Sequence, residues 1–446
     1  MIGGGTFTSH NKIIPGVYQN LKTAPDTSVR IADVGTLAMT IPLPFGDREE
    51  FIEITGGEFL SGASLAKVGL DVNSDTSSAR LMRMGLRGAR RLLVHNGNTG
   101  GARATITYNG LTVTSPHFGI DGNDTIITVN AAGTSLFDVR TFFKGNQVHI
   151  QTVPNIQSLR NNAFAVFTGT GALTVSAGIN LAGGADGTFN ENTAYQRLFE
   201  MSQTERIDQI AILTDNQQIK SVTKETLQFL NEEEGRKLKA TTLEYAADFE
   251  RITSTTGQTF TMDGVDYNEF EVLALLAGMS AGCPLGEDLT GTTITGSSNL
   301  DPVYTRSEME ERLQEGLLCL GVNESTGEVM IIQDINTLRT FTQDRGEILR
   351  FNPIMRFADS WELSVRDIWV NRYMGRPNTD LQREAFRLDV VTLGRLYEQM
   401  GAIQGFRGAE SVTVTAGTKK NEVVLIAEWL DTVVGMHFLY ATTIIM

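Results

Sequence analysis

The sequence has little cysteine, and this scarcity excludes a fold built on disulfides. Only Cys283 and Cys319 occur among 446 residues, whereas chains that depend on oxidation for stability normally carry several cysteine pairs. We therefore expect both to be small buried core residues and the chain to be kept in a reducing compartment. The first residues, MIGGGTFTSHNK, lack a basic segment followed by an apolar run, so no secretory signal is expected there.

Long apolar runs and excess positive charge are missing as well. The most apolar interior stretch, residues 272–285, contains two glycines and a proline and is shorter than the roughly 20 residues that cross a bilayer. Lys and Arg number 37 against 52 Asp and Glu, and the resulting net charge of −15 repels nucleic-acid backbones and anionic membranes. We expect no nucleic-acid partner and no direct membrane insertion.

Motifs of catalysis and of cofactor binding are also absent from the sequence. The five histidines are scattered, and there is no H-E-x-x-H, no G-x-x-x-x-G-K-[ST] and no G-x-S-x-G. The acidic run at residues 232–234 is better explained as a solvated helix end, and Asp334 and Asn336 as turn-capping residues. We therefore expect no catalytic residues, no cofactor, no metal site and no enzyme.

Glycine is abundant, with 45 residues, and one long stretch carries few charges. Residues 96–190 hold four acids and four bases, about 8% charged against 20% for the chain. Short β-branched segments separated by Gly and Asn fill this stretch, beginning with TITYNGLTVT, whose Asn109-Gly110 pair favours a type I′ hairpin turn. The pattern predicts an inserted all-β domain, a sandwich or a barrel, at residues 97–187.

The segments that flank this insert alternate helical and strand patterns, the order typical of an α/β layer architecture. We predict a mixed-sheet α/β core from residues 27–96 and 188–430, either as one unit or as two subdomains, about 188–300 and 27–96 with 301–430. Thr305 and Glu308 form a capping box that predicts a helix over 305–320. A longer amphipathic helix is expected over 379–400. Its predicted apolar face comprises Leu381, Ala385, Leu388, Val391, Leu396 and Met400.

The two ends, residues 1–26 and 431–446, are predicted to be extended arms. The segment 433–446, VVGMHFLYATTIIM, is β-branched and aromatic throughout, which predicts a strand. Both of its faces are apolar, so it would aggregate at an open edge; it is either a central strand of its own domain or pairs with another subunit. The apolar group of residues 13–18 cannot bury itself, so the N-terminal arm is either disordered or docked on a neighbour.

Six features occur in a fixed order along nearly the whole chain. They are GGGTF with KIIPGVY, LAGGADG after the β-insert, FLNEEEGRKLKATT with ADFERI, DINTLRTFT, NRYMGRPNTDLQREAF, and the apolar terminal strand. In this order they resemble contractile phage tail sheath proteins, above all the PBSX-type sheaths of myophages and phage-tail-like particles of Gram-positive bacteria. The resemblance implies a sheath core next to an inner tube, an outward β-domain, and terminal arms that donate strands to adjacent subunits.

The resemblance also implies particular interface residues. In the N-terminal arm they are Ile13, Ile14, Pro15, Gly16, Val17 and Tyr18. In the C-terminal arm they are Val434, Met436, Phe438, Tyr440 and Ile444. The acceptor hairpin would lie within residues 411–429, with Val412, Val414, Val423, Leu425 and Ala427. On the charged face of the 379–400 helix, Arg383, Glu384 and Arg387 are candidates for facing the tube, because exposed ion pairs are weak and can release.

The function implied by the resemblance is structural. The chain would polymerise helically around an inner tube and contract to drive the tube through a target cell envelope. Its partners would be further copies of itself, a tail tube protein, and baseplate and tail terminator proteins. Assembly would take place in the bacterial host cytoplasm, as part of a released phage tail or phage-tail-like particle. On the residues alone, two alternatives remain: a non-contractile assembly protein of the tail tube or surface-layer type, and an α/β enzyme without a recognisable motif.

Overall fold

A seven-stranded mixed sheet forms the centre of the computed structural model, which describes residues 3–5, 16–18, 31, 35–428 and 430–437. All neighbouring strands are parallel except the antiparallel pair β4–β5. The strand order is β21 (Leu317–Leu318), β17 (Ile252–Thr255), β16 (Lys239–Leu243), β15 (Gln209–Ala211), β3 (Thr36–Ile41), β5 (Arg91–Asn96) and β4 (Ile52–Thr55). The predicted α/β class with a mixed sheet is confirmed.

Helices cover both faces of this sheet, as the alternation along β3 requires. Leu37 and Met39 pack in the core cluster that contains α3 (Ser77–Leu86) and α6 (Glu269–Gly282). Ala38, pointing the other way, packs with α4 (Glu191–Ser202) and α5 (Gln217–Glu232). Because successive side chains of a strand point to opposite faces, a strand that is apolar throughout needs cover on both sides.

The inserted stretch forms a β-sandwich, so the all-β prediction is confirmed. One sheet has the order β11 (Asn146–Val153), β10 (Leu136–Phe143), β9 (Thr125–Gly133), β13 (Ser176–Asn180), and the other β12 (Val166–Gly169), β8 (Leu111–Thr114), β7 (Thr105–Tyr108). Between β7 and β8, Asn109 and Gly110 have φ values of 47° and 82°, as a type I′ turn requires. The chain enters and leaves through a two-stranded neck, β6 (Asn98–Thr99) paired with β14 (Thr188–Phe189).

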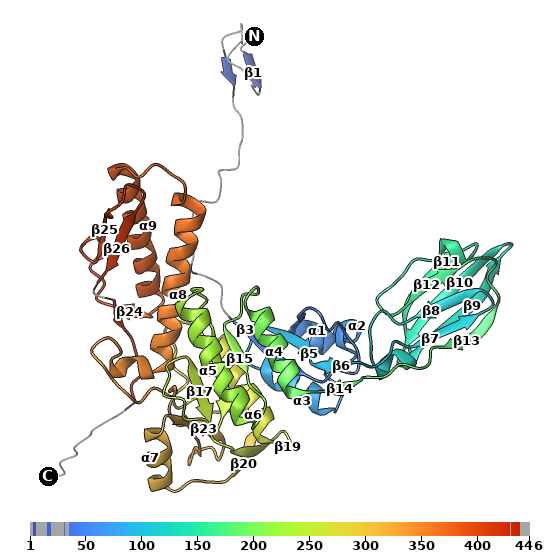
Figure 1. Ribbon diagram of the computed structural model, residues 1–446, viewed down its shortest axis with the longest axis horizontal. Coiled ribbons are helices and arrows are strands. Elements are labelled where there is room, and N and C mark those ends of the chain that lie inside the picture. The colour runs from blue at the N-terminus through green and yellow to red at the C-terminus, as the bar shows by residue number, and fades with distance from the viewer. Residues whose placement is uncertain (1–2, 6–15, 19–30, 32–34, 429, 438–446) are drawn as a thin grey trace.

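The C-terminal part forms a third packing unit, on the other side of the core from the sandwich (Figure 1). Its long helices α8 (Asn352–Ile368) and α9 (Asp380–Gln399) share an apolar cluster with the hairpin β25 (Val412–Ala416) and β26 (Val423–Ala427). The remaining helices are α1 (Gly56–Ser61), α2 (Leu65–Val68) and α7 (Arg306–Gln314). The remaining strands are β1 (Gly3–Gly5), β2 (Gly16–Tyr18), β18 (Thr259–Met262), β19 (Val265–Tyr267), β20 (Ser297–Asp301), β22 (Leu320–Val322), β23 (Val329–Ile331), β24 (Ile403–Gln404) and β27 (Asp431–Thr432).

Two helix predictions need correction. The helix predicted over 305–320 begins at the expected capping box but ends at Gln314, and residues 317–318 and 320–322 form β21 and β22. Gly316 breaks the helix with a φ of 80°, a left-handed conformation that glycine adopts without strain. Helix α9 forms as predicted, but its apolar face was misplaced.

The buried face of α9 is set by its aromatic residues. Leu381, Leu388 and Met400, assigned to the apolar face, are 76%, 51% and 48% exposed. The face that packs into the unit carries Phe386, Val390, Val391, Leu393, Gly394 and Tyr397. Large rings bury the most apolar surface and therefore decide the rotation of the helix.

Buried ion pairs attach α8 to the central sheet. The Asp359 carboxylate, on α8, pairs with Arg251 beside β17 and with Lys239 on β16, whose Nζ lies 3.1 Å from Oδ2. Asp359 is only 5% exposed. Burial alone would raise its pKa, but the two cations outweigh burial and hold the pKa below its ordinary value.

We expect the substitution Asp359→Asn to destabilise the fold strongly. It leaves Lys239 and Arg251 buried without a counter-charge, which costs about 3 kcal/mol of unfolding free energy. Urea unfolding at neutral pH measures this loss. Asp75→Asn is the control, because Asp75 is 86% exposed and its substitution should change the free energy by less than about 0.5 kcal/mol. A D359N protein as stable as D75N would contradict this role.

The same carboxylate makes stability depend on pH. Because the pKa of Asp359 is lower in the folded chain than its ordinary value of 3.8, its contribution is complete above the unfolded pKa and is lost as the pH falls through the folded one. The difference in unfolding free energy between the wild type and D359N should therefore shrink progressively below about pH 4. Urea titrations across that range measure it, and a constant difference would refute the assignment.

Candidate functional site

The described part of the chain shows interaction surfaces rather than a reaction centre. Among those residues, no three His, Cys, Asp or Glu side chains gather to hold a metal ion, and none of the helices there is long and apolar enough to span a bilayer. Cys283 and Cys319 are free and buried. Burial raises their pKa values to about 11 and about 12, so both remain thiols at neutral pH and react poorly. The surfaces of interest are the hairpin β25–β26, the chain ends and the neck.

The hairpin β25–β26 contains all five predicted acceptor residues. Val412 lies opposite Ala427, and Val414 lies opposite Leu425. Together with the half-buried Val423, these side chains face the apolar cluster of α8 and α9. The other face of the hairpin exposes Val424 and Ile426 at 44% and 49%.

Both outer edges of the hairpin are open within the described residues. Neither β25 nor β26 pairs with any described strand except the other. An open edge presents a row of backbone N–H and C=O groups that can bind an added strand. The hairpin therefore has the geometry of an acceptor, although its use as one stays a prediction.

The C-terminal segment does not form the predicted strand where the structure describes it. After β27 pairs with β24, residues 433–437 have no regular secondary structure within the single chain, and a strand formed by pairing with another subunit stays a prediction. The Gly435 N–H and the His437 ring both bond to Asp288. Val434 is half-buried and Met436 is fully exposed. The predicted residues Phe438, Tyr440 and Ile444 lie outside the described residues.

The N-terminal arm is described only in part. Gly16, Val17 and Tyr18 form β2, which pairs in parallel with β1. Ile13, Ile14 and Pro15 lie outside the described residues. A two-stranded pair of this length is only marginally stable in water on its own. The role of these residues in an interface stays a prediction.

The three residues predicted to face the tube are largely paired within their own chain. Arg387 donates to Glu384 over 2.6 and 2.8 Å and to the Ala409 carbonyl over 3.0 Å. Arg383 donates to Asp380 and to Asn378. Glu384 remains half exposed. Next to these charges, Leu381 and Leu388 form an exposed apolar stripe one heptad apart.

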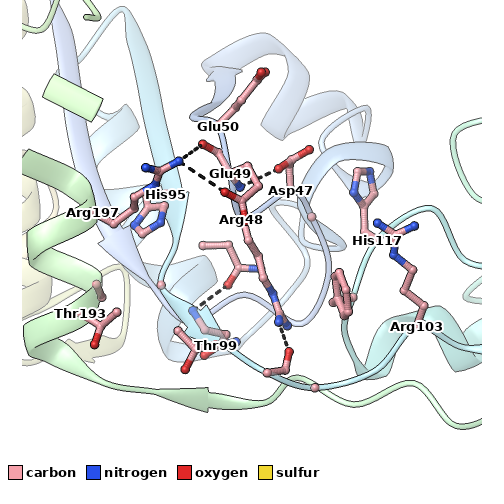
Figure 2. Close-up of a pocket in the computed structure, with 18 of the residues that line it drawn as sticks. Asp47, Arg48, Glu49, Glu50, His95, Thr99, Arg103, His117, Thr193 and Arg197 are labelled. Carbon is pink, nitrogen blue, oxygen red and sulfur yellow. Dashed lines mark hydrogen bonds and ion pairs between the residues drawn. The ribbon is translucent and has the colours of Figure 1, made fainter. Parts of the chain in front are cut away.

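The neck is clamped by Arg48, from the loop after β3 (Figure 2). Its guanidinium donates to the Asp186 carbonyl over 2.6 Å and to the Gly100 carbonyl. It therefore binds both the segment that enters the sandwich and the segment that leaves it. The Phe118 ring lies between Arg48 and Arg103, 4.8 Å from each guanidinium carbon. These residues line an open cavity of about 720 Å³.

Other residues of the same cavity are also engaged within the protein. Arg197 pairs with Glu49 at 3.4 Å and with Glu200 at 3.3 Å. Burial lowers the pKa of His95 to about 4, so its imidazole is neutral at pH 7 and shares a hydrogen bond with Thr40. These cavity residues are therefore engaged in contacts within the core.

A second set of contacts fixes the sandwich to the core. Phe143 and Phe164 of the sandwich pack on Phe45 of the core, with ring centroids 5.6 and 6.4 Å from it. Lys144 pairs with Asp121 at 2.8 Å and donates to the Gly69 carbonyl at 2.9 Å. The sandwich is thus attached through packed side chains as well as through the two strands of the neck.

The residues of the neck were not predicted from the sequence. Arg48 and Lys144 act on backbone carbonyls that are distant in sequence, and such contacts leave no local pattern. The sequence signal that exists is glycine at position 119. With a φ of 131°, Gly119 lies so close to the core that a Cβ would stand 1.9 Å from the Pro44 carbonyl oxygen.

Family models match the chain in three consecutive blocks. Residues 98–186 match the beta-sandwich domain of phage tail sheath proteins, residues 189–337 match their central domain, and residues 344–445 match their C-terminal domain. Together the three blocks cover more than half of the chain.

Individual proteins agree with these matches. The phage-like element PBSX protein XkdK of Bacillus subtilis is 29% identical over 381 residues, 80% of each chain. The solved sheath tail protein Lin1278 of Listeria innocua is 25% identical with a TM-score of 0.80, over 90% of this chain and 93% of that one. The helical sheath of the anti-feeding prophage in its contracted state is 10% identical with a TM-score of 0.57, over 97% and 99%, and shows the fold alone.

We expect Gly119→Ala to loosen the junction between core and sandwich. Gly133→Ala is a matched control, because Gly133 has a similar φ of 140° but open space around its Cβ position, so both substitutions carry the backbone strain and only one carries the clash. G119A should lower the unfolding free energy by about 1–3 kcal/mol more than G133A does. Urea unfolding of both variants measures the difference. Equal losses would show that Gly119 does not hold the sandwich against the core.

Proposed function

The chain belongs to the phage tail sheath family, and we infer that it is the repeating structural subunit of a contractile tail sheath. It polymerises helically around an inner tube and contracts to drive that tube through a target cell envelope. The observation that carries the proposal is the hairpin β25–β26, whose two edges lack a strand partner among the described residues. The same chain carries apolar strand-forming sequences at both of its ends.

Strand exchange follows from the physics of this hairpin. The inner face of the hairpin is held by the apolar cluster of α8 and α9, while its two open edges still present unpaired backbone groups. An arm of another subunit that adds to an open edge supplies the missing backbone hydrogen bonds, and its alternate side chains reach pockets on either face. Residues 13–18 and 434–444 are the proposed donors, and the exposed Val424 and Ile426 become covered when strands are added.

Contraction needs no reaction in this proposal. Subunits in the extended sheath bury less surface than subunits in the contracted one, and the extra burial supplies the free energy. The exchanged strands keep neighbours connected while other contacts break and re-form. The assembly then works once, and no catalytic residue or cofactor is required.

The tube is the proposed partner of the exposed face of α9. The Glu384 side chain is 51% exposed, whereas those of Arg383 and Arg387 are 16% and 20% exposed and are paired within the chain, so contacts to a tube compete with existing partners and stay weak in water. Weak contacts suit a sheath that must slide off its tube. Baseplate and tail terminator proteins are the further proposed partners, and the host cytoplasm is the proposed place of assembly.

Removing residues 438–446 is expected to abolish assembly without unfolding the subunit. The described core clusters contain none of these residues, so the circular dichroism spectrum and the melting temperature of the truncated chain should equal those of the wild type. Negative-stain electron microscopy of the purified chain should show tubes or rings for the full protein and none for the truncated one. Tubes formed by the truncated chain would eliminate C-terminal strand donation, and an unfolded truncated chain would show that the segment is an internal strand.

Charge reversal on α9 tests the tube contact separately. The double substitution Arg383→Glu and Arg387→Glu should leave sheath polymerisation intact but reduce sheath loading on isolated tubes at least about tenfold, because opposed charges become like charges. Co-sedimentation with tubes measures loading. Reversal of Arg306 and Arg312 on α7 serves as the control for net charge. Equal loading by both double variants would remove α9 from the tube interface.

A further inference from the structure

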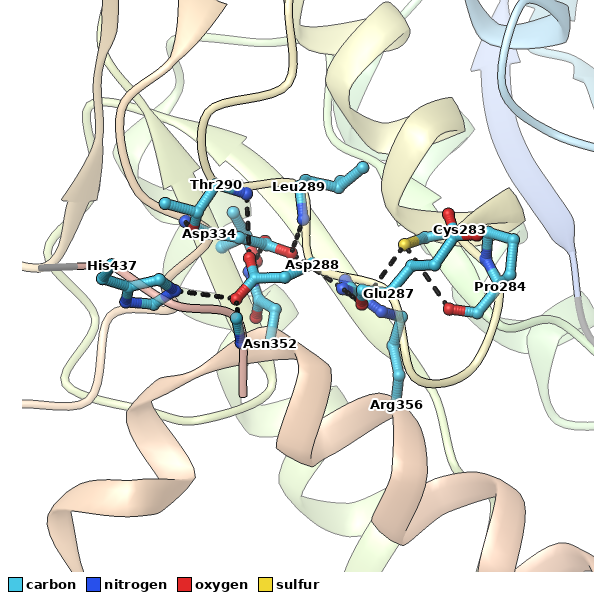
Figure 3. Close-up of polar contacts among 12 residues, drawn as sticks. Cys283, Pro284, Glu287, Asp288, Leu289, Thr290, Asp334, Asn352, Arg356 and His437 are labelled. Carbon is cyan, nitrogen blue, oxygen red and sulfur yellow. Dashed lines mark hydrogen bonds and ion pairs between the residues drawn. The ribbon is translucent and has the colours of Figure 1, made fainter. Parts of the chain in front are cut away.

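One carboxylate holds the last described residues of the chain. Asp288 lies in the loop that follows α6, and its Oδ2 atom accepts from the Gly435 N–H over 3.2 Å and from His437 Nε2 over 2.8 Å (Figure 3). Its Oδ1 atom accepts from the Thr290 N–H over 2.8 Å. Because an ionised carboxylate only accepts hydrogen bonds, Nε2 of His437 carries the hydrogen.

The fit around Asp288 is close. A Cβ on residue 435 would stand 2.9 Å from Asp288 Oδ2 and 3.1 Å from its Cβ, so a larger residue there would push the Asp288 side chain aside. The His437 ring also lies 5.6 Å from the Phe351 ring at the start of α8. The side chains of Asp288 and His437 are each only 9% exposed.

The loop that carries Asp288 is anchored independently of the C-terminal segment. Buried Arg356 on α8 donates to the Glu287 carbonyl over 3.1 Å and to Asp334 over 2.8 Å. Asp334 also accepts from the Leu289 N–H over 3.3 Å. The loop is therefore held to the core from beneath, while the residues of the C-terminal segment rest on its outer side.

We propose that Asp288, Gly435 and His437 form a latch that sets the free length of the C-terminal arm. The inference rests on the proposed function, since it concerns the segment that links one sheath subunit to the next. With the latch closed, His437 is the last described residue that is fixed to the core. With the latch open, the nearest preceding backbone hydrogen bond is that of the Val433 N–H, which donates to the Ala402 carbonyl, and the four residues 434–437 are released from Asp288.

The released length is large enough to matter between subunits. Four residues extend by about 14 Å at 3.3–3.6 Å per residue. The latch can open alone, because the Asp334–Arg356 contacts beneath it involve no residue of the arm. A subunit can thus follow a neighbour that moves away without losing the exchanged strand, and Met436, exposed between the two latch residues, becomes available to that neighbour.

The latch itself is tested on the unassembled full chain. Hydrogen exchange of the Gly435 amide should become at least about tenfold faster in His437→Ala than in the wild type. The substitution removes the hydrogen bond from His437 to Asp288, so the segment that carries Gly435 is bound less tightly to that carboxylate. His437→Gln should keep most of the protection, since its Nε2–H donor stands the same number of bonds from Cα. His149→Ala, in the sandwich, is the control. Unchanged exchange in H437A would overturn the latch.

The change of length is tested on assembled wild-type sheath. Exchange of the amides of residues 434–437 should differ by at least about tenfold between extended and contracted particles. Equal protection in both states would refute the two-length linker even if the latch forms in the free subunit. Failure of the wild-type chain to assemble at all would count against the sheath function, and the exchange of the free subunit would still decide whether the latch exists.

Discussion

The backbone of the β25–β26 hairpin imposes the constraint on which the rest of this molecule depends. Each of the two strands forms backbone hydrogen bonds to the other along one edge. The second edge of each strand has no strand partner in the described chain. The backbone groups on these open edges can bind an added strand, and we propose that strands from other subunits extend the hairpin into a larger sheet. The central sheet differs, because helices cover both of its faces and its strands bury side chains on both sides. The subunit is therefore closed at its core and open at its C-terminal unit.

A subunit linked to its neighbours through the hairpin can move with them only if force on the hairpin reaches the core. Asp359 joins α8 to β16 and to Arg251 through buried ion pairs, and the hairpin packs on the same apolar cluster as α8 and α9. At the far side, Arg48 and the packing of Phe143 and Phe164 on Phe45 fix the sandwich to the core. A pull on the hairpin is therefore transmitted to the core and the sandwich through packed elements.

Local patterns in the sequence predicted much of this architecture, and contacts distant in sequence account for what was missed. The Asn109-Gly110 turn and the capping box at Thr305 act within a few residues and were found correctly. The rotation of α9 was misjudged, because Leu381 and Leu388 fit the helical period while Phe386 and Tyr397 fill the core. The latch at Asp288 joins residues 149 positions apart, and a single histidine in an apolar segment gives no sign of such a partner. The acceptor hairpin was placed through family resemblance, and its alternating pattern alone did not show which of its edges stay open.

The central claim is that strands from other copies complete the hairpin. A cryo-electron microscopy map of the assembled sheath, at a resolution that separates strands, tests it most directly. The account predicts β25 and β26 at the centre of a larger sheet, flanked on at least one edge by an arm that belongs to a different subunit. A hairpin that remains two-stranded in the assembly, or that is completed by the terminal segments of its own chain, would contradict the account.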